Sequence, residues 1–397
     1  MKIGIDARMY GSQQAGLGRY VEQLVLGLVE QDKENEYILF AKDPSLILPL
    51  SRGGNFKIVK VNIPWYSWQE QIKFKKIIDQ EKIDLMHFPH WNVPLLYNKP
   101  FVVTVHDLIM YHYPRQEAST HGPVVYWLKD LVHRIVLRHA VRRAQKIIVT
   151  CEFTKQDINQ TLGVPLEKMV VSYQAPFERN KEQGVRSKNE LERFKINKPY
   201  VLYVGNAYPH KNLAGLLKAW KIFEEKYSGD YQLVLVGKNN FFYQKILCHC
   251  EELQSDEAIT VKQGIATPCS GRARNDSVIF TDYLSDSDLV EVYQHASLYV
   301  FPSLYEGFGL PPLEAQQYNV PVVSSSASCL PEILGESVLY FDPNNYEQMA
   351  DVINIGLTDE NIRFELQKNA KENLQRFSWD KLVKETVRVY LSCSKGF

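Results

Sequence analysis

Two glutamates, Glu306 and Glu314, have the residue type and spacing that suit recognition of hydroxyl groups. They lie in the stretch 301–314, F-P-S-L-Y-E-G-F-G-L-P-P-L-E, with seven residues between them. The proline pair that begins at Pro311 suits a first helical turn. The stretch therefore predicts a strand that ends near Pro302, a loop that carries Glu306, and a helix with Glu314 in its first turn.

Glycines in the same loop favour a phosphate ligand. Gly307 and Gly309 can take positive φ, so the loop can present backbone N–H groups at the positive end of the helix dipole. The expected donors belong to Phe308, Gly309 and Leu310. Phosphate donors beside carboxylates that accept ribose or sugar hydroxyls indicate a nucleotide-sugar site. A loop that only turns the chain is the alternative.

The elements that must position this stretch form two series of alternating strands and helices. Such alternation predicts α/β domains with doubly wound parallel sheets. The first series has expected strands at 2–6, 37–41, 56–61, 84–88, 101–106 and 146–151, and helices at 20–30, 68–81, 124–144 and 153–162. The second has strands at 200–205, 231–236, 278–281, 297–301, 320–324 and 338–341, and helices at 213–227, 241–254, 286–295, 313–318, 346–357 and 360–375.

Two domains are expected, because 397 residues exceed one ordinary hydrophobic core. The first domain spans 1–178 and the second 198–377. Between them, 180–197 is charged and poor in large apolar residues, as a linker or exposed segment would be. A last helix is expected within 378–397.

The chain resembles the retaining glycosyltransferases of family 4, which have the GT-B fold. The likeness covers nearly the whole chain and is strongest in Y-V-F-P-S-L-Y-E-G-F-G-L-P-P-L-E-A, residues 299–315, and C-L-P-E-I-L-G, residues 329–335. It implies two Rossmann-like domains facing a cleft, with the last helix crossing back to the first domain. It also implies that the first domain binds the acceptor, that the second binds the donor, and that transfer retains anomeric configuration without a bound metal.

A glycine-rich turn, 11–18, follows the first expected strand and lets backbone approach a ligand. It is not G-x-G-x-x-G and no acidic residue follows at the expected place, which disfavours a dinucleotide cofactor. A flexible loop is the alternative. The resemblance implies that Gly16 and Gly18 supply site backbone at the donor phosphates and the acceptor.

His106 and Asp107 come just past a predicted buried strand, where ligands of open α/β sheets bind. A lone histidine is usually structural, but the resemblance implies that His106 lies near the reacting sugar and that both residues contact the acceptor. A metal site is rejected, because the neighbouring histidines have no i, i+4 pair and no accompanying carboxylate pattern. These histidines are His87, His90, His112 and His121.

In the second series, Y-V-G-N-A-Y-P-H-K-N-L, residues 203–213, follows a strand and opens a helix. Lys211 is placed to neutralise a diphosphate as its bond to the sugar breaks. The resemblance implies that Asn206 also contacts the donor, although many family members have arginine there and at His210. Phosphate stabilisation then depends more on Lys211 and on the helix near Gly309.

The segment after the strand at 278–281 contributes one weaker candidate. The resemblance places Tyr283 beside the nucleotide base. The following Asp286–Asp288 spells D-x-D, a metal–diphosphate motif of another fold, but Ser285 or Asp286 here indicates a helix N-cap with acidic first-turn residues.

The composition is that of a soluble globular protein. Hydrophobic residues make up 45% and charged residues 23%, and the zero net charge gives no general attraction to nucleic acid. No stretch approaches the roughly 18 apolar residues of a membrane span, and the N-terminus lacks a signal-peptide pattern. The six cysteines show no metal-binding spacing, so we expect reduced thiols in a cytoplasmic protein.

One helical segment, 126–146, combines an apolar face with a basic side that includes Arg134, Arg138 and Arg142. Such a helix suits anionic lipid at the inner face of a membrane and a polyprenyl-diphosphate-linked acceptor. A solvated face is the alternative. The expected apolar face consists of Leu128, Leu131, Val132, Ile135, Val136 and Ala140.

We therefore predict a hexosyltransferase with no cofactor, which moves a hexose from a nucleotide-diphosphate sugar to a hydroxyl of a glycan or lipid-linked acceptor. Resemblance to bacterial mannosyltransferases of polysaccharide assembly favours GDP-mannose as donor, then UDP-glucose or UDP-N-acetylglucosamine. A nucleotide-sugar epimerase or hydrolase, or a non-catalytic binding subunit of the same fold, are the alternatives. The polar loop 263–277 has no assigned role.

Overall fold

Two compact units make up the chain. The first contains Met1–Gln174 together with Phe377–Phe397, and the second contains Ala175–Arg376. A computed structural model describes residues 1–11, 15–47, 54–114, 122–177, 189–227, 229–254 and 277–394. Several expectations lie outside the described residues, namely those on 12–14, His121, 180–188 and 263–276.

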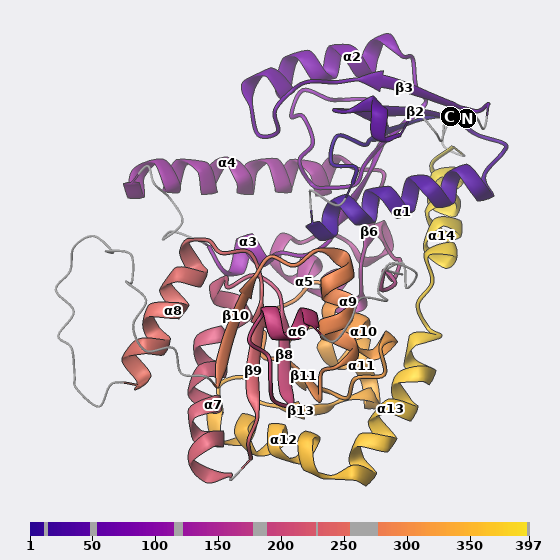
Figure 1. The fold of residues 1–397 in the computed structure, drawn as a ribbon. Coiled ribbons are helices and arrows are strands. Elements are labelled where there is room, and N and C mark those ends of the chain that lie inside the picture. Colours follow the sequence, from indigo (N-terminus) through magenta and orange to yellow (C-terminus); the bar gives the residue numbers. More distant parts are fainter. Residues whose placement is uncertain are drawn as a thin grey trace. The chain divides into compact units, whose positions relative to one another are not determined.

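The first unit is built on a parallel sheet, which in the described part of the chain has seven strands in the order β3-β2-β1-β4-β5-β6-β7 (Figure 1). The strands are β1 Lys2–Asp6, β2 Glu36–Ala41, β3 Phe56–Lys60, β4 Leu85–Phe88, β5 Phe101–Val105, β6 Lys146–Val149 and β7 Met169–Val171. The helices are α1 Ala15–Gln31, α2 Lys75–Gln80, α3 Ile109–His112, α4 Gly122–Arg143, α5 Glu152–Leu162 and α14 Trp379–Ser394, with a π-helical turn, Glu70–Phe74, before α2.

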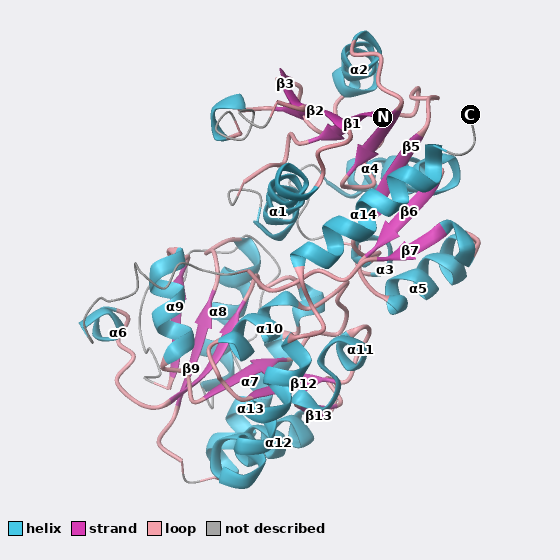
Figure 2. Cartoon of the chain, turned by 90° about the vertical axis from the view of Figure 1, so that its right-hand side faces the viewer, coloured by secondary structure: helices cyan, strands magenta, loops and turns pink. Residues whose placement is uncertain are grey.

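Helices cover both faces of this sheet (Figure 2). Side chains of α1 and α14 form one apolar layer, and side chains of α2, α4 and α5 form the other. Burial on both faces explains why a strand such as β5, F-V-V-T-V, is almost continuously apolar rather than alternating.

The last helix, α14, lies beside α1 although it comes from the other end of the chain (Figure 1). Gly27 permits this close packing, because a Cβ there would lie 2.5 Å from Val383 Cγ2. On the sheet, Tyr390 Oη lies 2.6 Å from His87 Nδ1. The C-terminal helix is therefore part of the first unit.

The second unit has a parallel sheet of six described strands in the order β10-β9-β8-β11-β12-β13. The strands are β8 Tyr200–Val204, β9 Gln232–Val236, β10 Val278–Asp282, β11 Leu298–Phe301, β12 Val322–Ser325 and β13 Leu339–Phe341. The helices are α6 Asn189–Arg193, α7 Leu213–Lys226, α8 Phe241–Gln254, α9 Asp286–Gln294, α10 Leu310–Gln317, α11 Leu330–Leu334, α12 Tyr346–Thr358 and α13 Glu360–Leu374.

The predicted α/β class with two doubly wound parallel sheets is confirmed. Among the strands and α-helices of the described residues, four short ones were not predicted, namely β7, α3, α6 and α11, and none is longer than five residues. Such short segments contain too little sequence to display a helical or strand period. The helix α6 also lies inside the segment expected to be a linker.

The predicted apolar face of α4 is only half buried. Val136 and Ala140 lie in the core, whereas the N-terminal half of the helix exposes large apolar side chains. The exposed residues include Trp127, Leu128, Leu131, Val132 and Ile135. Arg134 departs from the expected basic side, because its Nε lies 2.7 Å from Asp130 Oδ2 and its guanidinium stacks on Tyr111. None of the described helices combines the length and apolar composition needed to cross a membrane.

Candidate active site

In the second unit, the strand order reverses between the neighbouring strands β8 and β11. Ligands of open α/β sheets bind outside the carboxyl ends of the strands at such a switch point. The loop after β8 carries Asn206 and Lys211, and the loop after β11 carries Glu306. Topology alone therefore brings these three polar side chains to one edge of the sheet.

Lys211 and Glu306 form an ion pair, with Nζ 2.5 Å from Oε1. Their side chains retain only 14% and 8% exposure, so the charges are largely removed from water. The two loops are also joined through the backbone, because Leu304 N donates to His210 O at 2.7 Å. The predicted phosphate-binding lysine and the predicted sugar-binding glutamate are thus held next to each other.

Asn212 fixes the turn that presents Lys211. Its backbone is left-handed, with φ of 57°, and it precedes the first residue of α7. Its Nδ2 donates to Pro302 O at 3.2 Å and to Pro343 O at 2.8 Å. One asparagine therefore ties the loop after β8 to the ends of β11 and β13.

The backbone of Glu306 is held by the segment that precedes α11. Glu306 N donates to Ser328 Oγ at 2.9 Å, and Cys329 Sγ donates to Glu306 O at 3.3 Å. Sequence reasoning noted C-L-P-E-I-L-G only as a family likeness and did not anticipate this contact. Through Cys329, this motif therefore holds the backbone of the loop that carries Glu306.

Gly309 is the N-cap of α10 and has the left-handed conformation, with φ of 88°. Any Cβ at this position would lie 2.8 Å from Leu330 Cδ2, so only glycine fits without movement. Pro311 has no backbone N–H, and neither does Pro312. Within the first turn, amide donors toward a ligand are therefore concentrated at Gly309 and Leu310.

Glu314 lies beyond the first turn of α10, not within it, because the helix begins at Leu310. The side chain is buried, and Tyr293 Oη lies 3.4 Å from its Oε2. Tyr293 in turn stacks on Tyr318, with ring centroids 5.5 Å apart. The predicted start near Pro311 is off by one residue, because the αL glycine Gly309 is the N-cap, and the expectation that Glu314 lies in the first turn is wrong.

In the first unit, His106 follows β5 and has a hydrogen-bond partner at each ring nitrogen. Nε2 lies 2.9 Å from Pro89 O, and Gln174 Nε2 donates to Nδ1 at 3.0 Å. Burial lowers the pKa of His106 to about 4, so the ring is neutral near pH 7. A neutral ring with both nitrogens engaged can position a neighbouring group but does not supply a proton. Asp107 Oδ1 accepts from the backbone N–H of Ile109, the first residue of the short helix α3, at 2.9 Å.

The glycine-rich turn is described only at its ends. Gly11 N donates to Gly18 O at 3.3 Å, so the ends of the turn lie close together. Gly16 is exposed and Gly18 is buried at the start of α1. Gly11 has φ of 103°, which allows the chain to reverse after β1.

Two family models together match most of the chain. The model described as "Glycosyltransferase Family 4" matches residues 15–175, and the model described as "Glycosyl transferases group 1" matches residues 187–373. The chain belongs to the glycosyltransferases of family 4. Its two parallel-sheet units are the two domains of the GT-B fold.

Relatives of this glycosyltransferase include two bacterial mannosyltransferases. It is 27% identical to O-antigen chain mannosyltransferase B of Escherichia coli, over 77% of this chain and 74% of the relative. It is 26% identical to O-antigen chain mannosyltransferase RfbU of Salmonella typhimurium, over 73% and 72%. Among solved structures, Anabaena HepE in complex with UDP and glucose has a TM-score of 0.67 at 17% identity, over 98% of this chain and 99% of that one.

Two further predicted donor residues of the glycosyltransferase lie on loops at the same sheet edge. Asn206 O accepts from Tyr203 Oη at 2.8 Å, which anchors the start of the lysine loop. Tyr283 is 72% exposed after β10, and its N–H donates to Asp282 Oδ1 at 2.7 Å. The predicted N-cap at Ser285 is confirmed, because its Oγ accepts from Asp288 N at 3.2 Å.

Proposed function

We propose that this glycosyltransferase is a retaining hexosyltransferase that moves a hexose from a nucleotide-diphosphate sugar to a hydroxyl of a glycan or lipid-linked acceptor. The observation that carries the proposal is the buried Lys211–Glu306 pair at the switch point of the second unit. A fixed cation beside a hydroxyl-accepting carboxylate suits the junction between a diphosphate and a sugar. Such preorganised charge is usually a large part of catalysis.

The donor would be bound by residues of three loops. Lys211 would contact the diphosphate, Glu306 the sugar hydroxyls and Glu314 the ribose hydroxyls. The backbone of the loop before α10 would face the phosphates, where the helix dipole favours an anion. The supporting residues are Asn206, Tyr283, Gly307, Phe308, Gly309 and Leu310.

GDP-mannose is the first candidate donor, because both relatives named above are mannosyltransferases. UDP-glucose and UDP-N-acetylglucosamine are the next candidates, since the structurally similar HepE is described with UDP and glucose. Retention of anomeric configuration and independence from metal are inferred from the family resemblance. A chelator should therefore leave the reaction rate unchanged.

The acceptor would contact the first unit through His106 and Asp107, and the backbone of Gly16 and Gly18 would lie at the donor phosphates and the acceptor. A lipid-linked acceptor is supported by α4, which exposes large apolar side chains beside the exposed Arg138, Arg142 and Arg143. Co-sedimentation with phosphatidylglycerol vesicles tests this part. Binding that is lost in an Arg138→Glu/Arg142→Glu variant, and is absent with neutral phosphatidylcholine vesicles, would support it.

The direct test measures nucleotide-diphosphate release from a panel of GDP-, UDP- and ADP-sugars, with and without saccharide acceptors. Lys211→Ala and Glu306→Gln should each reduce release from the active donor by at least about 100-fold, as loss of a transition-state contact does. Lys226→Ala and Glu336→Gln are matched controls, because Lys226 forms an exposed pair with Asp351 and Glu336 is exposed.

The outcomes separate the proposal from its alternatives. Acceptor-dependent release that is lost in both site variants supports a transferase. Release that never depends on an acceptor favours a hydrolase or epimerase. Nucleotide binding without release from any donor favours a non-catalytic subunit.

A further inference from the structure

A small recess lies at the switch point of the first sheet, where β1 and β4 are neighbours and the strand order reverses. Its free volume is about 10 Å³, room for one water-sized group. Asp6 ends β1, and Pro89 and His90 directly follow β4. The lining residues are Asp6, Met9, Leu17, Val21, Trp65, Pro89, His90 and Asn92.

Two polar atoms of this lining lack a partner. Trp65 Nε1 and His90 Nδ1 are inaccessible and have no hydrogen bond within the described structure. Buried polar atoms without partners are rare and cost about 1–3 kcal/mol each. The indole N–H can only donate, whereas a neutral imidazole nitrogen can accept. One hydroxyl group, which both accepts and donates, would satisfy both atoms.

The chemistry around the recess disfavours an anion. Burial lowers the pKa of His90 to about 3, so this ring is neutral near pH 7. The buried Arg8 is already engaged by two carboxylates, with Nη2 2.7 Å from Asp6 Oδ2 and 2.6 Å from Glu70 Oε1. One cation between two carboxylates leaves the cluster negative. An uncharged hydroxyl is the ligand that fits.

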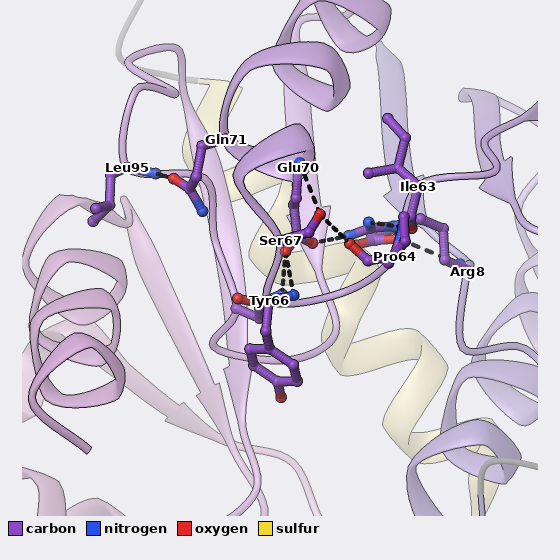
Figure 3. Close-up of polar contacts among 10 residues, drawn as sticks. Arg8, Ile63, Pro64, Tyr66, Ser67, Glu70, Gln71 and Leu95 are labelled. Carbon is purple, nitrogen blue, oxygen red and sulfur yellow. Dashed lines mark hydrogen bonds and ion pairs between the residues drawn. The ribbon is translucent and has the colours of Figure 1, made fainter. Parts of the chain in front are cut away.

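Glu70 holds the backbone of Tyr66, the residue that follows Trp65 (Figure 3). Its Oε2 accepts from Tyr66 N at 2.8 Å and from Asn92 Nδ2 at 2.9 Å. The Tyr66 backbone has φ of 57°, a strained conformation that this hydrogen bond stabilises. Arg8, Glu70 and Asn92 are thus positioning residues for the recess wall.

Aromatic rings stand next to the recess. The Tyr66 ring points away from the charged network (Figure 3) and is 62% exposed. Its centroid lies 5.7 Å from Trp91 and 6.5 Å from His90. Trp65 lines the recess itself, whereas Tyr66 and Trp91 lie beside His90 outside the lining. A saccharide ring has the apolar C–H face and the hydroxyls that this arrangement can accommodate.

We infer that the recess binds one hydroxyl group of an uncharged saccharide, through Trp65 Nε1–H as donor and His90 Nδ1 as acceptor, with the sugar ring beside Tyr66. This inference rests on the proposed function and specifies its acceptor as a neutral sugar. It adds Trp65 and His90 to the residues that would select the acceptor.

The experiment titrates the full chain with methyl α-mannoside, methyl α-glucoside and their monodeoxy analogues, using ligand-observed NMR. Trp65→Phe keeps an aromatic ring but removes the N–H, and should weaken binding of the preferred glycoside about tenfold, equivalent to about 1.4 kcal/mol. Trp68→Phe is the matched control, because Trp68 is 87% exposed. Mannose 6-phosphate serves as the charged probe and should not bind better than the neutral glycosides.

The deoxy series provides the decisive pattern. Removal of one particular hydroxyl should weaken binding to the wild type more than binding to Trp65→Phe, because only the His90 hydrogen bond remains to be lost in the variant. Equal loss in both proteins, or no glycoside binding to the wild type with nucleotide present, would overturn the inference. GDP and UDP affinities are measured on the same samples. If nucleotide binds normally but the monodeoxy glycosides do not distinguish the two proteins, only the inference about the recess is wrong. If nucleotide does not bind, the proposed function is wrong.

Discussion

Lys211 Nζ lies 2.5 Å from Glu306 Oε1, although 95 residues separate the two in the chain. Each residue is presented by a loop that follows a central strand of the second sheet, and each loop is held by its own supporting residues, Asn212 for Lys211 and Ser328 for Glu306. The pair is therefore built before any ligand arrives. A donor would meet a cation whose position is already fixed.

The pair should also contribute to folding stability in a way that a double-mutant cycle reveals. Removing one buried charge leaves the other unpaired, so Lys211→Met and Glu306→Gln should each destabilise the chain by about 1–3 kcal/mol. The double variant should cost less than the sum by about 1–2 kcal/mol. Urea unfolding of the four proteins measures this coupling. Strictly additive losses would show that the two charges do not stabilise one another.

Glu314→Gln should weaken nucleotide binding about tenfold, because a carboxylate accepts hydroxyl hydrogen bonds more strongly than an amide does. Calorimetric titration with GDP and UDP measures the change. Glu336→Gln provides the same substitution at an exposed site of the second unit and should leave affinity unchanged. A ribose role for Glu314 is wrong if the affinity of Glu314→Gln equals that of this control.

Local sequence patterns were sufficient for the fold because the strands and helices of an α/β unit are set by local periodicity. Apolar runs such as V-L-Y-V in β8 and amphipathic helices such as α7 carry their own signals. The glutamate loop was also recognisable, since glycines and prolines mark its backbone. The wrong local prediction was Glu314 in the first turn of α10, because the helix begins at Leu310 after the left-handed N-cap glycine.

Contacts between distant segments were not readable from the sequence. Ser328 and Cys329 form hydrogen bonds with the backbone of Glu306 from a turn more than twenty residues away. The sequence S-A-S-C-L-P contains no pattern that predicts these hydrogen bonds. Residues of three loops line the recess in the first unit, and the buried ion pair of Arg8 and Glu70 holds its wall. For His90 the sequence pattern only excludes a metal site, and for Trp65 it indicates no role.

Arg8→Met should be one of the most destabilising substitutions in the first unit. It leaves the carboxylates of Asp6 and Glu70 in the interior without their shared cation, which costs about 3–5 kcal/mol for a buried network. Lys57→Met removes the cation of the Lys57–Glu81 pair, where the lysine is 59% exposed, and should cost less than about 1 kcal/mol. Urea unfolding compares the two. Similar losses would mean that the Arg8 network is no stronger than a surface pair.

Buried neutral histidines should make the first unit acid-sensitive. His87 is fully buried, with Nδ1 2.6 Å from Tyr390 Oη and Nε2 2.8 Å from Thr104 Oγ1, and burial lowers its pKa to about 3. The unfolded chain has the ordinary pKa of 6.5, so below that pH it binds more protons than the folded chain does. Stability is thus complete above about pH 6.5 and is lost as the pH falls toward 3. At pH 5 each such histidine should cost about 2 kcal/mol, since one pKa unit equals about 1.4 kcal/mol.

Urea unfolding between pH 8 and pH 5 measures this dependence. Carboxylates such as Asp32, whose pKa lies below the ordinary 3.8 because Tyr37 and Asn35 donate hydrogen bonds to it, add their own loss only at lower pH. The window from pH 6.5 to 5 therefore isolates the histidines, and the window from pH 8 to 6.5 is an internal control that should be nearly flat. His87→Gln should be less stable at pH 7.5 yet lose less stability on acidification. An unchanged slope in this variant would show that His87 is not among the groups that titrate on unfolding.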